Sequence, residues 1–408
     1  MEEKKMQEQP QAKTEKVDLF SGITKNVFVL GIVSFLTDTG TEMIYPLLPI
    51  FLTQVLKTGP VFVGLVEGIA ESTASFFRIF SGWLSDKLNQ RKNLIVSGYT
   101  LSGVTRPLIA MAMAGWQVLI IRFIDRIGKG VRGAPRDALI ADSTDPQFMG
   151  KAFGFHRSLD HAGAVLGPIC AFWLLSLYPG NYRYVFWCAT IPAVLCVIIL
   201  ILFVREKRRE VTAAPKIALT LKSFDVRFKL YLVILFIFTL GNSSDAFLLL
   251  RAKDVGIETK FIPLLWAVLH IVKMLSSTPG SAWSDKIGRS RVIILGWGIY
   301  SLIYLGFAFA SNHIHIWLLF AVYGIYFGLT EGTEKALIAD LVPKESRGTA
   351  YGLYSFAIGL AALPASLILG AIWQATNATI AFSFGAGIAV LAILMFLSWC
   401  LIGNKTKW

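Results

Sequence analysis

Residues 138–142 read Ala138-Leu139-Ile140-Ala141-Asp142, and the same five letters return 198 positions later as Ala336-Leu337-Ile338-Ala339-Asp340. At the same offset Gly150 matches Gly348, Ala152 matches Ala350 and Gly154 matches Gly352. A second stretch, Ser85-Asp86-Lys87, returns as Ser284-Asp285-Lys286 at an offset of 199. An offset this constant over two stretches indicates that the second half of the chain repeats the first in the same direction.

Both halves are strongly apolar. Of the 408 residues 55% are hydrophobic and only 16% are charged, against about 25% in soluble domains. Apolar stretches of 18 or more residues recur along the chain, each long enough to cross a hydrocarbon core of about 30 Å. We therefore predict an all-α membrane protein with twelve transmembrane helices, at residues 25–53, 61–83, 92–113, 116–141, 149–178, 183–204, 227–251, 262–283, 291–311, 315–340, 347–372 and 379–402.

The net charge of +13 does not indicate a nucleic-acid partner. The basic residues lie in short loops, at the chain ends or singly within apolar runs, so no continuous basic surface is expected. The cysteines lie in apolar segments without ligand-like spacing, which favours buried thiols over disulfides or a metal site. We predict no cofactor. The four cysteines are Cys170, Cys188, Cys196 and Cys400.

Lysine and arginine in the loops predict the orientation, since they favour the cytoplasmic side. The 204–229 segment and the turns at 87–92 and 286–291 are basic, whereas the connections near 114, 180, 312 and 375 carry almost no positive charge. We expect a multi-pass protein of a bacterial inner (plasma) membrane with both termini cytoplasmic. Residues 1–24 read as a cytoplasmic tail rather than a signal peptide. The predicted parts are tail 1–24, bundle 25–204, linker 205–226, bundle 227–402 and tail 403–408.

The turn Gly82-Trp83-Leu84-Ser85-Asp86-Lys87-Leu88-Asn89-Gln90-Arg91-Lys92 resembles the loop motif of the major facilitator superfamily (MFS) between helices 2 and 3. Its second copy, residues 284–291, lies between helices 8 and 9. Asn89 and Gln90 depart from the usual glycine and basic residue. The resemblance covers residues 25–402 and implies the MFS fold, two pseudo-symmetric six-helix bundles. It also implies gating roles for Asp86, Arg91, Asp285 and Arg289; a basic loop without a gating role is the alternative.

A second motif lies in the fifth predicted helix. Gly154, Gly163, Gly167 and Pro168 follow G-x8-G-x3-G-P, which resembles the helix-5 motif of MFS antiporters and drug exporters. The match is partial, because Ala171 and Phe172 follow where the family has further glycines. Small residues at these spacings let a helix pack closely against its partner. The resemblance favours export and a gating role for these four residues; ordinary close packing is the alternative.

The fourth predicted helix carries seven charged side chains within an arc of about 140°. Facing lipid, each would cost on the order of 3 kcal/mol near the bilayer centre, so this face must line the protein interior or a water-filled cavity. Five cations and two acids leave the face net positive by three, which favours an anionic solute. Pairing with acids on helices 1 and 2 is the alternative. The candidates for solute binding on this face are Arg122, Arg126, Lys129 and Arg132. The other charged residues are Asp125, Arg136 and Asp137.

Acids on the first two helices are suitable partners. Helix 1 carries Asp38 and Glu42 with Tyr45 on the same face, and helix 2 carries Glu67, Glu71 and Arg78. Carboxyl groups in a low-dielectric interior can exchange protons near neutral pH. We therefore predict proton coupling, with static ion pairs as the alternative. The proton-coupling candidates are Asp38, Glu42, Glu71 and Asp245. His156 and His161 do not share a helix face, so no metal site is predicted there.

Comparison of the halves adds candidates in the second one. At offset 199 Glu71 corresponds to His270 and Ala74 to Lys273, and at offset 198 Gly133 corresponds to Glu331. At these positions the two halves repeat each other in sequence order but carry side chains of different charge. We add these three residues of the second half, together with Tyr45, to the solute-binding candidates.

These observations predict a monomeric secondary transporter that works by alternating access. It would move a small anionic solute such as an organic acid, an anionic metal chelate or an anionic drug, coupled to protons and in the direction of export. Proton-coupled import of such a solute is one alternative, and a membrane sensor or assembly factor on a transporter scaffold is another. The expected partners are the solute, protons and membrane lipid. An enzyme is not predicted, because no nucleophile elbow, phosphate loop or run of metal ligands is present.

Overall fold

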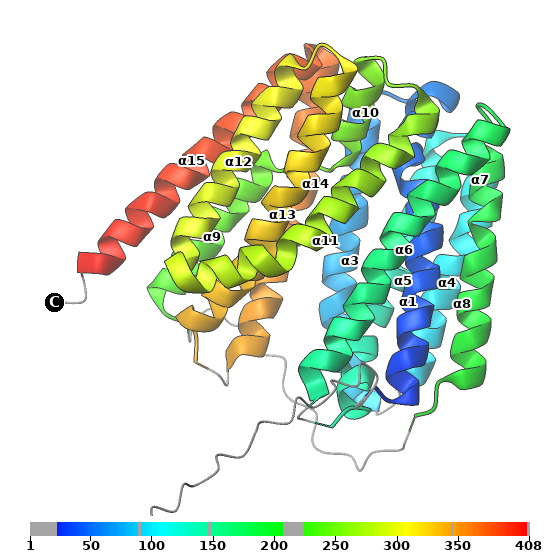
Figure 1. The fold of residues 1–408 in the computed structure, drawn as a ribbon, viewed down its shortest axis with the longest axis horizontal. Coiled ribbons are helices and arrows are strands. Elements are labelled where there is room, and N and C mark those ends of the chain that lie inside the picture. The colour runs from blue at the N-terminus through cyan, green and yellow to red at the C-terminus, as the bar shows by residue number, and fades with distance from the viewer. Residues whose placement is uncertain (1–22, 89–90, 146–147, 207–223, 344–345, 406–408) are drawn as a thin grey trace, which may run out of the picture.

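The structure is a computed structural model that describes residues 23–88, 91–145, 148–206, 224–343 and 346–405. The predicted tails, 1–24 and 403–408, and the linker, 205–226, lie for the most part outside the described residues. Within these ranges the chain is helical and forms no strand. The helices fall into two groups side by side, the N-terminal half in blue to green and the C-terminal half in green to red (Figure 1).

Each half consists of six spans. In the first half α1 is continued to Val55 by η1 (Tyr45–Leu47), α2 (Leu48–Ile50) and η2 (Phe51–Val55). It is followed by α3 (Pro60–Leu88), α4 (Arg91–Met111), α5 (Gly115–Asp142) and α6 (Met149–Leu177), and by the sixth span, α7 (Tyr182–Cys188) with α8 (Thr190–Phe203). Helix α1 itself is Lys25–Ile44, begun by a hydrogen bond from the Val27 amide to the Thr24 hydroxyl.

The second half repeats this order. Its first span is α9 (Val226–Gly241) with α10 (Ala246–Asp254), and the next is η4 (Thr259–Phe261) with α11 (Ile262–Ile287). It ends with α12 (Arg289–Phe309), α13 (His313–Leu341), α14 (Arg347–Ala375) and α15 (Ala378–Lys405). The prediction of an all-α fold with twelve spans is confirmed. By length and apolarity alone, nine of the described spans qualify to cross a membrane, and α3, α4 and α5 do not. Those three carry the buried charges of the first half.

The seventh span is broken between α9 and α10, where the sequence predicts one continuous helix. Backbone groups exposed at membrane depth must find partners inside the protein. Tyrosines of neighbouring helices supply them: the hydroxyl of Tyr300 donates to the Gly241 carbonyl at 2.9 Å. The Ser243 hydroxyl lies 3.2 Å from that of Tyr304. The break places Asp245 beside α13, where its carboxylate accepts a 2.7 Å hydrogen bond from Tyr323.

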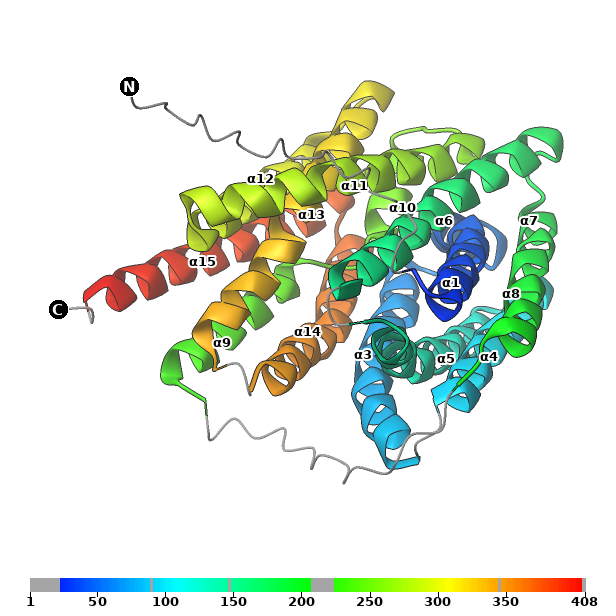
Figure 2. The same cartoon turned by 60° about the horizontal axis from the view of Figure 1, so that its bottom comes forward.

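The two halves touch mainly along two helix pairs, α3 with α14 and α6 with α11. Figure 2 shows α14 beside α3 and α11 beside α6. We call the end of the molecule that holds Lys25, Phe203 and Val226 the linker end, and the opposite end the loop end. The contacts between the halves gather toward the loop end, where the Val61 amide meets Gln374 at 3.4 Å and Phe172 stacks on Phe261 at 5.9 Å.

Halfway along α3, the Ser72 hydroxyl still bonds the Gly359 carbonyl of α14, at 2.6 Å. Beyond this point, toward the linker end, α3 side chains are exposed: Phe76 is 61% exposed and the side chain of Arg78 is 58% exposed. The halves therefore close against each other at the loop end and separate toward the linker end, which leaves a crevice between them. We call this space the central crevice.

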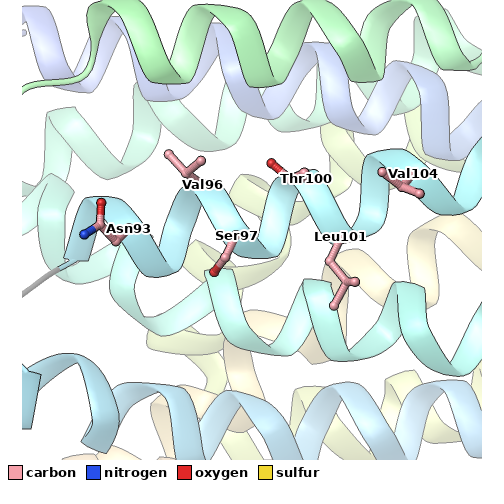
Figure 3. Close-up of a pocket in the computed structure, with 6 residues that line it drawn as sticks. All are labelled: Asn93, Val96, Ser97, Thr100, Leu101 and Val104. Atoms are coloured by element: carbon pink, nitrogen blue, oxygen red, sulfur yellow. The ribbon is translucent and has the colours of Figure 1, made fainter.

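A separate shallow groove lies on the outward face of α4 (Figure 3). It is lined mainly by apolar and small polar side chains, among them Val96, Leu101 and Val104. None of the candidate solute-binding residues lines it. Its residues belong to the lipid-facing surface rather than to the central crevice.

Candidate functional site in the central crevice

The charged face of α5 meets α3 through ion pairs. Both carboxylate oxygens of Glu67 accept hydrogen bonds of 2.9 Å from Arg122 Nη2. The two side chains are only 2% and 4% exposed, so this pair is buried. Arg126 lies 3.5 Å from Glu71, whose side chain is half exposed, and 3.7 Å from Asp125. Two predicted solute-binding cations thus have acidic partners on the neighbouring helix.

The other α5 cations have different surroundings. Arg132 is buried and packs its guanidinium over the ring of Tyr99, 4.3 Å from the ring centroid. Toward the linker end, Arg136 pairs with Asp137 at 2.9 Å, and Asp137 also lies 3.2 Å from Arg78. This partner lies on α5 itself and not on helix 1 or 2.

Lys129 differs from these residues. Its side chain is exposed although it lies midway along α5, and it has no ion-pair partner among the described residues. The charges that act on it most are Arg126 on its own helix, Glu71 on α3 and Asp38 on α1. With these charges of α1, α3 and α5 around it, Lys129 lies on the inner side of the first half, and its side chain is exposed to the central crevice.

The acids of α1 lie in the same half as α5. Asp38 lies beside the carboxyl group of Asp160 on α6. Asp160 accepts a 2.5 Å hydrogen bond from Ser34 and lies 3.4 Å from Arg157. One turn further along α1, Glu42 accepts a 2.7 Å hydrogen bond from Trp266 of α11, in the other half.

Tyr45 packs against that same tryptophan, with ring centroids 5.0 Å apart, and the Arg122 guanidinium lies 5.9 Å from its ring. His270 also contacts Trp266, edge to face at 5.1 Å, and neither ring nitrogen of His270 has a hydrogen-bond partner among the described groups. The structure thus brings Glu42, Tyr45 and His270 together around one tryptophan.

Other candidates in the second half form a compact ion cluster. Lys273 lies 2.9 Å from Glu331 and 4.4 Å from the centroid of the Phe327 ring. Lys335 lies 3.5 Å from the same carboxylate. Asp245 stays apart from this cluster, bonded to Tyr323 near the helix break.

Sequence reasoning missed two residues that the structure places at the site. Trp266 stands at the position of Glu67 in the repeat at offset 199, and this correspondence does not by itself indicate a role. Arg106 of α4 is 4% exposed and donates to the Thr37 carbonyl and the Thr41 hydroxyl, both at 3.0 Å. A lone arginine inside the apolar run 92–113 is the signal that would have found it. In the described ranges no three side chains suited to metal ligation come together.

The repeated turn motifs form equivalent ion pairs at the linker end. Arg91 bonds Asp142, and 198 positions later Arg289 bonds Asp340, with Nη1 and Oδ2 2.8 Å apart. Each pair joins the start of one helix to the end of another, α4 to α5 and α12 to α13. Arg289 also lies 3.7 Å from Asp285. The side chain of Asp86 lies outside the described residues.

The glycines of the helix-5 motif differ in their surroundings. A Cβ atom added to Gly163 would lie 3.1 Å from the Phe35 Cα, and one added to Gly167 would lie 3.1 Å from Glu42 Cβ and closer still to the Thr39 carbonyl. A Cβ on Gly154 would meet nothing within 4 Å. Pro168 is buried next to this contact. Close packing of α6 on α1 therefore depends on two of the three glycines.

This difference gives a prediction with its own control. Gly167→Ala is expected to destabilise the protein by about 1–3 kcal/mol, because the added methyl group overpacks the α1–α6 contact. Gly154→Ala adds the same methyl group into open space and is expected to leave stability unchanged. Thermal unfolding in detergent measures both. Equal melting temperatures for the two variants would contradict the close packing of α6 on α1.

Two six-helix groups that enclose a charged crevice and expose apolar side chains on their outer faces define a multi-pass membrane protein of the transporter class. The family model "Major Facilitator Superfamily" matches residues 30–272 and 230–407. The chain belongs to the major facilitator superfamily. It is accordingly a transporter and not an enzyme.

Individual relatives and a solved structure agree with this family assignment. An uncharacterised MFS-type transporter of Methanocaldococcus jannaschii is 35% identical over 381 residues, which cover 92% of this chain and 95% of the relative. The multidrug resistance protein MdtH of Salmonella newport is 23% identical over 388 residues, 92% of this chain and 93% of that one. The crystal structure of the nucleoside transporter NupG superposes with a TM-score of 0.76 at 15% identity, over 92% of this chain and 99% of that chain.

Proposed function

We propose that this transporter moves a small solute with an acidic group across the membrane by alternating access, coupled to the movement of protons. The observation that carries the proposal is Lys129, an exposed cation at mid-membrane depth with no ion pair in the described part of the chain. A charged side chain at this depth is energetically unfavourable, and such residues usually bind a solute, an ion or another charged group. A carboxylate or phosphate group is the complementary ligand.

The orientation follows from the loops. Arg205 and Arg227 lie at the linker end, and the short connections at the loop end carry few cations. By the positive-inside rule the linker end, where α1 begins and α15 ends, is cytoplasmic. The central crevice then opens to the cytoplasm, and the described conformation is inward-facing.

Coupling to protons is supported by the acids around Lys129. Asp38 and Glu71 both act on its charge, and Glu42 lies one turn from Asp38. A carboxyl group beside a solute-binding cation can couple proton binding to solute binding, because the carboxylate and an acidic solute compete for the same cation and a proton on the carboxyl group leaves the cation free for the solute.

Two observations support the direction of export. The helix-5 glycines resemble those of MFS antiporters, and Gly163 and Gly167 make the close contact with α1. The relative MdtH carries the name multidrug resistance protein. Import of an organic acid or an anionic chelate would use the same crevice with proton and solute moving together. Proton flux measured during solute movement separates the two, since exchange moves protons against the solute and symport moves them with it.

Lys129→Gln is expected to weaken solute binding about tenfold or more, since a charge-assisted contact of about 1.5–3 kcal/mol is lost. A thermal-shift panel of carboxylates, organic phosphates and iron chelates identifies the ligand, and a titration of the strongest hit measures the change. Lys129→Arg keeps the charge and should retain most binding.

Lys253→Gln is the matched control, because this lysine lies at the end of α10 away from the crevice. It should leave the affinity unchanged. An equal affinity in the Lys129→Gln variant and the unaltered protein would remove Lys129 from the solute site and with it the main support for an acidic solute.

A further inference from the structure

We infer that the hydrogen bond between Trp266 and Glu42 is a latch that holds the loop end closed, and that solute and protons act on the transport cycle through it. This inference rests on the proposed alternating access. It adds Trp266, which the sequence did not single out, as a positioning residue for transport. The latch joins α1 in the first half to α11 in the second.

The chemistry of this bond distinguishes it from the other contacts between the halves. Trp266 Nε1 lies 2.7 Å from Glu42 Oε2. The other hydrogen bonds between the halves, within the described ranges, join neutral groups, as between the Ser72 hydroxyl and the Gly359 carbonyl. The latch is therefore, within the described ranges, the hydrogen bond between the halves that has a carboxylate as its acceptor. Hydrogen bonds to a charged group are stronger than those between neutral groups.

Packing holds both partners in place. Trp266 is 5% exposed, and its ring contacts Tyr45 at 5.0 Å on the α1 side. Glu42 Cβ lies against Gly167 of α6, so the carboxylate has little freedom to move away from the indole. A bond that is short, partly buried and fixed at both ends must break when the loop end opens.

The charges of the proposed solute site also act on Glu42 of the latch. The cations that act on Glu42 are Lys129, Arg126 and Arg122 of α5, and Asp38 lies one turn before it on α1. On the other packed helices Glu42 contacts the Trp266 indole of α11 and Gly167 of α6. The titratable groups close to these contacts are His270, which packs on Trp266, and Asp160 of α6, which lies beside Asp38. An acidic solute bound to Lys129 neutralises the cation that acts on Glu42. A proton on Glu42 removes the negative charge of Glu42 itself. Either event changes the strength of the latch.

The test measures opening at the loop end and not transport. Ser366 is 2% exposed at the α3–α14 contact near the loop end, and Ser366→Cys places a thiol there with little change in size. Labelling by a membrane-impermeant maleimide in proteoliposomes reports how often the loop end opens. The chain without this substitution, with its four native cysteines, supplies the background rate.

Trp266→Phe keeps an aromatic ring beside Tyr45 and removes the N–H donor. We expect it to raise the labelling rate of the introduced thiol at least threefold. Trp297→Phe is the matched control, since Trp297 donates a 3.0 Å hydrogen bond to the buried carboxylate of Glu334 inside the second half. It should leave the labelling rate unchanged.

Glu42→Leu removes the acceptor and should raise the rate as Trp266→Phe does, with no further rise in the double variant. An unchanged rate in both single variants, or an equal rise in Trp297→Phe, would overturn the latch. If labelling behaves as expected but no solute or proton moves, the proposed function fails while the latch stands. If transport proceeds and labelling does not respond, only the latch fails.

Discussion

Glu67→Gln is expected to destabilise the protein by about 3 kcal/mol or more, because Arg122 would keep a buried positive charge after losing its bidentate partner. Breaking a buried ion pair from one side typically costs about 3–5 kcal/mol. Asp125, 3.4 Å from Arg122, compensates only in part, because it also lies near Arg126. Thermal unfolding in detergent and the yield of folded protein measure the loss.

Two comparisons make this result specific. The double variant Glu67→Gln/Arg122→Met removes both charges and should recover most of the stability, since a buried pair replaced by neutral groups is often nearly neutral in energy. Glu258→Gln breaks an exposed pair of similar length, with Lys260 2.8 Å away, and should cost less than about 1 kcal/mol. A double variant as unstable as the single one would mean that the pair has another role than charge compensation.

The fold can be predicted from the sequence because two independent signals agree. Apolar runs of membrane-spanning length mark most of the helices, nine of the described spans by length and apolarity alone. The repeat at offset 198 indicates two equivalent halves and so supports the spans that carry charges. The same offset relates the Arg91–Asp142 pair to the Arg289–Asp340 pair, so the repeat extends to side-chain contacts. The helix break before Asp245 is not predicted. The small polar run at 242–244 marks it, but the tyrosines that satisfy its backbone come from distant parts of the chain.

For the charges of the site, the sequence predicts that they face inward but not which partner each one meets. Periodicity places Arg122, Arg126 and Lys129 on one face of α5, and the pairing of each with an acid depends on the rotation and height of α3 beside α5. The two helices pair Glu67 with Arg122 and Glu71 with Arg126 at the same spacing of 55 residues, which leaves Lys129 without a partner there. The repeat does not supply this information, because the second half carries different charges at the equivalent positions.

Asp38→Asn is expected to abolish proton-driven transport while the protein still folds. An amide has the same shape as a carboxyl group but cannot release a proton at this site. The surrounding contacts stay in place, because Arg106 holds the neighbouring Thr37 carbonyl and Ser34 holds Asp160. Since Lys129 is retained, exchange of labelled solute across the membrane without a proton gradient should continue. A pH-sensitive dye inside proteoliposomes measures the loss of solute-driven proton movement.

Asp254→Asn is the matched control, because this aspartate ends α10 far from Lys129 and should leave proton movement intact. Normal coupling in the Asp38→Asn variant would shift the role to its neighbour Asp160 or to Glu42, and the corresponding single amide variants would decide between them. Loss of coupling in both Asp38→Asn and Asp160→Asn, with exchange preserved, would indicate that the two adjacent carboxyl groups share the transported proton. A pair of this kind spans α1 and α6, whose close packing at Gly163 and Gly167 would then keep the two acids in contact.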